Sequence, residues 1–323
     1  LGNTVTLTGA VTLDTSVTID TNNTVNDGNI SFSSTINGTS ANTQDLTTDA
    51  GSGTIAFNGA LGNTTSLKDV TITSGTATFA AAVHMDGNFV NSGIVNAGSV
   101  NWNVAGNWTN SGTFNHNNST VTFDGTGAVI TTGGTGTGKA FYNIVINSTG
   151  TKALAGAIDV DGTFELQTGT FICTGYNQNY AGNFTLTLGT TYTKGGTLTF
   201  DGDLILTDNT AVKQNLGTVV IGTSPDSIVL ASDISADSIT VNAADTLTTA
   251  GYDISLTDFL SIAATGTLNA SAGLGGDTAI TLAGTWTNSG TFTCGTSTVT
   301  FNGTAAQVIT SGASAFNNVT FNN

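Results

Sequence analysis

A short motif recurs along the chain at an interval of about 20 residues, and this repeat limits the fold more than any other feature. The motif is a small or acidic residue, a glycine, any residue, and then an aromatic residue or leucine. Its copies are Asp86–Phe89, Ala105–Trp108, Asp161–Phe164, Ala181–Phe184, Asp201–Leu204 and Ala283–Trp286. The longer gaps between copies are close to whole multiples of the interval. A period kept over a whole chain indicates stacked structural repeats.

A longer segment also occurs twice. Residues Ala105–Phe114 return almost unchanged as Ala283–Phe292, and each copy continues into a Ser-Thr-Val-Thr-Phe sequence and a further strand-like segment. His116 in the first copy corresponds to Cys294 in the second. Because the repeat accepts either residue at this place, we interpret the position as non-catalytic.

Apolar and polar residues alternate within the copies, as in Thr4–Thr8, Ser16–Asp20 and Thr120–Phe123. Such alternation with many β-branched residues predicts short strands that bury one face, and Asn-Gly, Asp-Gly and Ser-Gly pairs supply the turns between them. A unit of about 20 residues is too short for a propeller blade, but it fits one coil of a parallel β-helix. We therefore predict an all-β fold, a single continuous β-solenoid over residues 1–323 with about 16 coils of about 20 residues.

Composition excludes several other classes of protein. Only 8% of the residues are charged, arginine is absent, and the formal net charge is −16. Helical proteins need the Glu, Lys, Arg and Leu that this chain lacks, and an apolar fraction of 38% argues against disorder. The five lysines are scattered singly, so we expect no binding to nucleic acid or to anionic membrane surfaces. No apolar run is long enough for a transmembrane helix, so we expect no membrane insertion.

The aromatic residues of the motif read as core residues. We predict that they share one interior stack, whose members are Phe89, Trp108, Phe164, Phe184 and Trp286. The two cysteines, Cys173 and Cys294, are close to six periods apart. That separation places them on different coils, too far apart for a disulfide, and we predict two free, buried thiols.

The sequence contains candidate catalytic residues but no catalytic motif. The pairs of carboxylates closest in sequence are Asp159/Asp161 and Asp201/Asp203. In each pair one aspartate precedes a repeat glycine, and we interpret it as a turn residue. Neither His84 nor His116 has a nucleophile in a known motif. We therefore predict no catalytic, cofactor-binding or metal site and no enzymatic activity. Asp-Gly and Asp-Asn corners leave room for Ca²⁺.

The segment from Ala283 to Asn323 resembles the degenerate repeats of large bacterial surface and secreted proteins, the filamentous-haemagglutinin-like and autotransporter-like adhesins. The resemblance implies a right-handed parallel β-helix that is secreted or held at the cell surface. It fits a chain that is a segment or subunit of a longer assembly.

These observations favour a non-enzymatic, extracellular structural or adhesive protein, which forms a surface stalk or a fibre by stacking end to end with copies of itself. Neither end has the polar capping unit that repeat proteins use to cover a terminal coil. Surface glycans are the other partner considered. The alternatives are a carbohydrate-active enzyme, a glycan-binding module and an ice-binding solenoid. The ice-binding alternative rests on Thr-X-Thr pairs such as Thr4/Thr6, Thr71/Thr73, Thr197/Thr199 and Thr298/Thr300.

Overall fold

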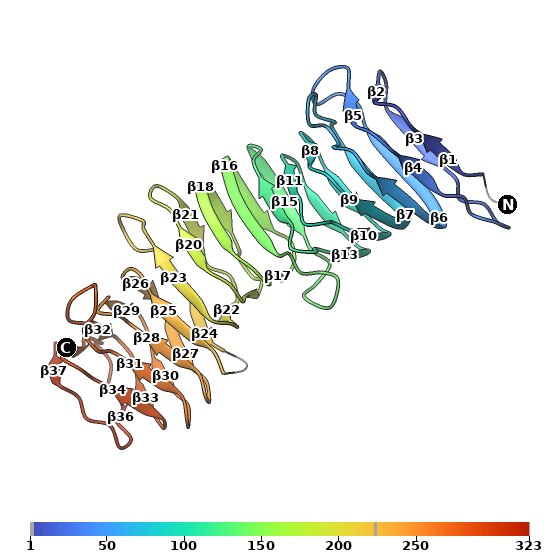
Figure 1. Cartoon of the computed structure of the whole chain (residues 1–323). Helices are drawn as coiled ribbons and strands as arrows, with labels where there is room; N and C mark the ends of the chain where they lie inside the picture. Colours follow the sequence, from blue (N-terminus) through green and yellow to red (C-terminus); the bar gives the residue numbers. More distant parts are fainter. Residues whose placement is uncertain (1–2, 223–224, 323) are drawn as a thin grey trace. The chain divides into compact units, whose positions relative to one another are not determined.

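The computed structural model describes residues 3–222 and 225–322, and the fold is built of short parallel strands (Figure 1). No helix occurs among the described residues. The strands stack as a β-solenoid of about 15 turns, roughly 21 residues apart. The predicted fold class is thus confirmed, with a turn slightly longer than the motif spacing suggested. The chain divides into two compact units, unit 1 (Leu1–Gly162) and unit 2 (Thr163–Asn323). Whether the solenoid is continuous stays a prediction.

Unit 1 carries three columns of parallel strands. One column contains β1 and β4 and continues to β10 and β13; the second runs from β3 to β9 and β12; the third contains β8, β11 and β14. The strands are β1 (Val5–Leu7), β2 (Val11–Leu13), β3 (Val17–Asp20), β4 (Ile30–Phe32), β5 (Ile36–Gly38), β6 (Leu46–Phe57), β7 (Val70–Phe79), β8 (Val83–Met85), β9 (Phe89–Asn91), β10 (Ile94–Asn96), β11 (Asn101–Val104), β12 (Trp108–Asn110), β13 (Thr113–Asn115), β14 (Thr120–Phe123), β15 (Gly127–Thr131), β16 (Asn143–Leu154) and β17 (Ile158–Val160).

Unit 2 repeats the arrangement. From β25 to β33, three strands make one turn, and each strand pairs in parallel with the third strand after it. The strands are β18 (Phe164–Ile172), β19 (Gln178–Tyr180), β20 (Phe184–Leu186), β21 (Thr191–Thr193), β22 (Thr197–Phe200), β23 (Leu204–Asp208), β24 (Thr218–Ile221), β25 (Ser227–Leu230), β26 (Ile234–Ala236), β27 (Ser238–Val241), β28 (Thr246–Thr248), β29 (Ile254–Leu256), β30 (Leu260–Ile262), β31 (Thr267–Asn269), β32 (Ala279–Leu282), β33 (Trp286–Asn288), β34 (Thr291–Thr293), β35 (Thr298–Phe301), β36 (Ile309–Thr310) and β37 (Asn318–Phe321).

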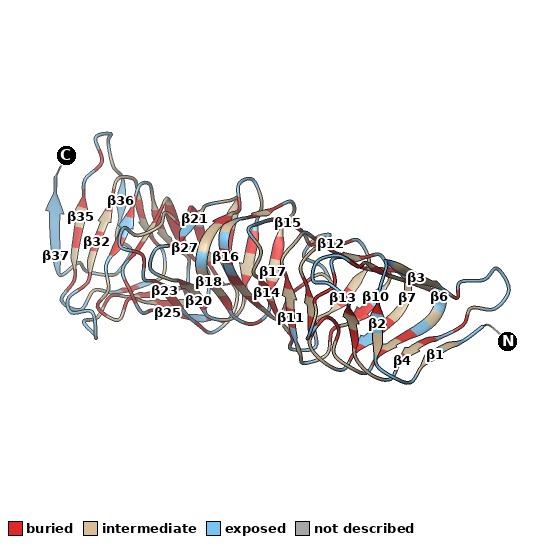
Figure 2. Ribbon diagram, turned by 90° about the horizontal axis from the view of Figure 1, so that it is seen from above, coloured by how far each residue is buried: buried red, intermediate tan, exposed pale blue. Residues whose placement is uncertain are grey.

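The interior is filled by the apolar residue at every second position of each strand, and buried and partly exposed residues alternate along the ribbons (Figure 2). Because consecutive turns stack in register, equal positions lie over one another. Phe32, Phe57 and Phe79 form such a column, with ring centroids 5.2 and 4.5 Å apart. These columns are the hydrophobic core of each unit.

The predicted aromatic stack is confirmed in part. Phe89 lies directly under Trp108 in unit 1, and Phe164 lies under Phe184 in unit 2. Trp286, however, belongs to another column, between Leu260 and Ile309, so the prediction of one shared stack was wrong for this residue. The motif marks a corner followed by an inward residue, and in unit 2 such corners precede more than one side of a turn.

The repeat glycine is needed because two turns approach closely at the corner. The Gly87 N–H donates to the Lys68 carbonyl at 2.8 Å, and the Gly106 N–H donates to the Gly87 carbonyl at 2.8 Å. A Cβ on Gly106 would lie 2.5 Å from the carbonyl carbon and oxygen of Gly87. Any side chain at this position would push the two turns apart.

Candidate functional site

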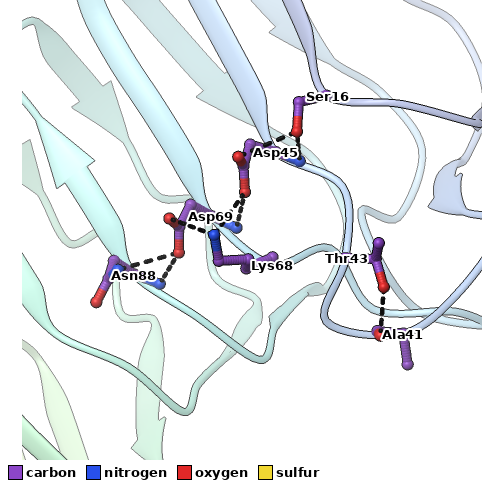
Figure 3. A network of polar contacts seen from close by, with 7 residues as sticks. All are labelled: Ser16, Ala41, Thr43, Asp45, Lys68, Asp69 and Asn88. Carbon is purple, nitrogen blue, oxygen red and sulfur yellow. Dashed lines mark hydrogen bonds and ion pairs between the residues drawn. The ribbon is translucent and has the colours of Figure 1, made fainter.

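Aspartate and asparagine side chains at one corner of unit 1 hold successive turns together (Figure 3). The Asp45 carboxylate accepts a hydrogen bond from the Asp69 backbone N–H at 3.3 Å, and Asp69 accepts from the Asn88 N–H at 2.6 Å. Asn88 in turn accepts from the Asn107 N–H at 2.8 Å. At the other end of this ladder, Ser16 donates to Asp45 at 3.0 Å. Each side chain caps the backbone of the next turn, which is a structural use of these residues.

The same use accounts for Asp203, one member of the predicted pair Asp201/Asp203. Asp203 accepts a hydrogen bond from the Ser227 N–H at 2.9 Å, one turn further along. Among the described residues, no group of three or more His, Cys, Asp or Glu side chains is placed to hold a metal ion. Binding of Ca²⁺ at a corner stays a prediction.

The second predicted carboxylate pair lies in a groove of unit 1 together with His116. The groove has a volume of about 740 Å³. One wall is the turn after β13, which contains His116, Asn117 and Asn118; another is the loop that contains residues 135–138; and Asp159 and Asp161, on either side of Val160, complete it. Polar side chains that are far apart in sequence therefore share one cavity.

His116 is held in a single orientation at this groove. Its Nδ1 accepts a hydrogen bond from the Asn118 N–H at 3.4 Å, which assigns the ring proton to Nε2. Nε2 lies 2.9 Å from Asp161 Oδ2 and donates to it. The ring of Tyr142 packs against the imidazole, with centroids 5.6 Å apart and planes 26° apart.

The turn that carries His116 has an unusual backbone. Asn117 and Asn118 both have positive φ, 46° and 62°, in the left-handed region that asparagine tolerates better than most residues. The Ser119 N–H closes the turn on the His116 carbonyl at 2.8 Å. These two asparagines place their side chains and that of His116 along the groove.

Solvent reaches both members of the pair. The Asp161 side chain is 48% exposed and that of His116 is 25% exposed. Such a pair offers hydrogen-bond donors and acceptors to a polar ligand. The arrangement is suited to binding.

The other predicted histidine and the cysteines have different surroundings. His84 Nε2 lies 3.4 Å from Asp86 Oδ1, and Asp86 also accepts a hydrogen bond from Ser66. Both cysteines are free, as predicted. Cys173 is buried, but Cys294 is only half-buried, so the prediction of two buried thiols was wrong for Cys294. It follows β34 at a corner, where the inward-outward alternation ends.

Sequence reasoning missed two buried polar features. In unit 2, the Tyr192 hydroxyl donates to Gln178 Oε1 at 2.7 Å beside Cys173, and burial raises the pKa of Tyr192 and of Cys173 well above their usual values. In unit 1, Lys152 is fully buried and donates to the carbonyls of Ala105 and Gly125 at 3.2 and 2.7 Å. A glutamine or lysine at an inward position of an alternating strand was the available signal.

The threonine pairs do not form two unbroken columns. Thr197 and Thr199 lie over Thr218 and Val220, which interrupts one column. Thr298 and Thr300 lie between Ala279/Thr281 and Asn318/Thr320. An ice-binding face stays an alternative.

Comparison of the chain with protein-family models, with curated proteins and with solved structures found no match. Within the described part of the chain, no helix has the length and apolar character needed to cross a membrane.

Proposed function

We propose that this chain is a structural protein of an extracellular stalk or fibre, in which copies stack end to end so that the solenoid continues from one copy to the next. The observation that carries this proposal is the match in pattern between the edge strands β37 and β1. The resemblance to bacterial surface repeats and the low-charge surface rich in threonine and asparagine support a secreted or cell-surface location.

The edge at β37 exposes residues that are buried one turn earlier. Val319 and Phe321 lie in register over Val299 and Phe301. The lower pair is fully buried, whereas Val319 is 40% and Phe321 is 66% exposed. The Phe321 ring stacks on Phe301 at 5.5 Å. Among the described residues, β37 pairs only with β35, so its other edge presents free backbone groups beside an apolar column.

The edge at β1 has the matching pattern. Val5 and Leu7 point inward over Ile30 and Phe32, and Thr6 points outward. The Val-Thr-Leu of β1 therefore matches the Val-Thr-Phe of β37 position for position. If β1 of a second copy pairs with β37, Leu7 covers Phe321 and Val5 covers Val319.

The connection lengths of the first turn match those of an inner turn of unit 2, whereas the connections after β35 and β36, beside the edge itself, are each seven residues long. Short connections follow β1 and β2, and a longer one follows β3. In unit 2, short connections likewise follow β29 and β30, and a longer one follows β31. Placing β1 on the column of β29 and β37 therefore keeps the order of sides. Neither edge strand carries a charge, the usual protection against edge pairing.

Substitutions at the two edges test the proposal. We expect Phe321→Asp and Leu7→Asp each to abolish stacking, because each would bury a charge in the contact. Thr320→Asp and Thr6→Asp add the same charge on the outward side of the same strands and should leave stacking largely intact. Sedimentation velocity over a range of concentrations measures the result.

Mixing the two inward variants gives the sharpest outcome. Phe321→Asp retains an intact β1 and Leu7→Asp an intact β37, so the mixture should form dimers and nothing larger. Assembly that survives in both single variants, or a mixture that stays monomeric while the unmodified chain assembles, would contradict the β37–β1 contact.

A further inference from the structure

The duplicated segment shows which parts of the groove the fold itself does not need. Both copies build the same strands, β13 and β14 in the first and β34 and β35 in the second. The copies differ at several positions, including Asn117 and Asn118, which correspond to Gly295 and Thr296, and three further differences concern the groove. His116 corresponds to Cys294, Tyr142 corresponds to Asn317, and the first copy has four more residues in the connection between Thr131 and Phe141 than the second has between Thr310 and Phe316.

These three differences meet at one place in unit 1. His116 and the extended connection line the groove, and the Tyr142 ring packs against the imidazole. Asp159 and Asp161 lie on the facing side, and Asp161 accepts the hydrogen bond from His116. The first copy thus adds to a common framework the residues that form and order a cavity.

The negative charges of the groove disfavour an anionic ligand. Its lining contains the carboxylates of Asp159 and Asp161 and polar side chains such as those of Asn117, Asn118 and Thr135, beside the apolar Phe114 and Ala140. The nearby ammonium of Lys139 donates to the carbonyls of Ser111 and Gly112. A phosphate, sulfate or uronic acid would be repelled by this lining, whereas hydroxyl groups would find both acceptors and donors.

We propose that this groove binds a neutral oligosaccharide. Its volume of about 740 Å³ is in the range of sites that enclose small ligands, about 300–1,000 Å³. His116, Asn118 and Asp161 form a preorganised set of polar groups, which reduces the ordering needed on binding. Tyr142 is a positioning residue, because it packs against His116. This binding goes beyond a structural role and needs no contact between copies.

The second copy supplies the substitutions for the test. In His116→Cys/Tyr142→Asn, these two positions carry the residues that the second copy has on the same framework, so the fold should be kept. The probes are neutral gluco-, manno-, galacto- and N-acetylglucosamine oligosaccharides and, beside them, sulfated and uronic-acid oligosaccharides, on a printed array and then by calorimetry. The host is Phe321→Asp, which removes the proposed stacking contact.

We expect binding of at least one neutral class and a loss of ten-fold or more in affinity in the double variant, with an unchanged thermal midpoint. Cys294→His, the reverse change in the second copy, should have no effect on affinity. Binding to none of the neutral probes, a preference for acidic probes, or neutral binding that the double variant retains would overturn the proposal. Because the host variant tests the groove without stacking, failure of either proposal leaves the other intact.

Discussion

Lys152 shows at the scale of one residue how this solenoid accommodates a charge in its interior. The ammonium is fully buried, and it donates hydrogen bonds to the carbonyls of Ala105 and Gly125. Burial lowers the pKa of Lys152 from its ordinary value of 10.5, and the carboxylate of Asp124 opposes this shift only in part. The folded chain therefore holds this proton less tightly than the unfolded chain does.

The sign of the resulting pH dependence follows from that difference. Because the unfolded chain binds more protons between the lowered pKa and 10.5, the free energy of unfolding should rise with pH over this interval. Lys152→Met removes the titration. Between pH 7 and pH 10, the wild type should gain stability relative to Lys152→Met, measured by urea unfolding at each pH. A difference between the two proteins that stays constant with pH would show that the ammonium is not desolvated.

Individual residues also show what could not be predicted from the sequence. The alternation placed Cys173 inside, where it lies, but placed Cys294 inside as well, because a pattern of alternation does not show at which residue a short strand ends. The contact between His116 and Asp161 spans 45 residues and depends on how the connection after Thr131 folds. The period does not encode such a connection.

At the scale of strands and columns, the turn-to-turn register is what stabilises each unit. Phe57 illustrates it, since its ring lies between those of Phe32 and Phe79 at 5.2 and 4.5 Å with nearly parallel planes. The period and the alternation were enough to predict parallel strands with such columns. They could not assign Trp286 to its column, because counting residues does not show which side of the turn a corner precedes.

Removing one member of this column should be costly. Phe57→Ala leaves a cavity between two rings, and we expect a loss of about 3–5 kcal/mol in the free energy of unfolding. Thr78→Ala, on the exposed side of β7 beside Phe79, should change stability by no more than about 0.5 kcal/mol. Denaturant unfolding of both variants makes the comparison. Equal effects would contradict the assignment of inward and outward faces in this part of unit 1.

At the scale of the whole molecule, the proposed role follows from one property of the fold: each turn of the solenoid packs against a neighbouring turn. Inside each unit, backbone pairing and apolar columns join consecutive turns, and in unit 1 a corner ladder of hydrogen bonds adds to them. At β37 and β1, half of these interactions are open among the described residues, and the two edges match in pattern and in order of sides. A fibre therefore needs only that β1 of a second copy pair with β37 in the way that successive turns pair within one copy.

Electron cryomicroscopy of the concentrated, unmodified chain tests this claim most directly. The account predicts filaments in which strands lie perpendicular to the axis, with a continuous layer line at about 4.8 Å and with β1 of one copy paired in parallel with β37 of the next. Single copies at every concentration, or filaments joined through the sides of the solenoid, would contradict it.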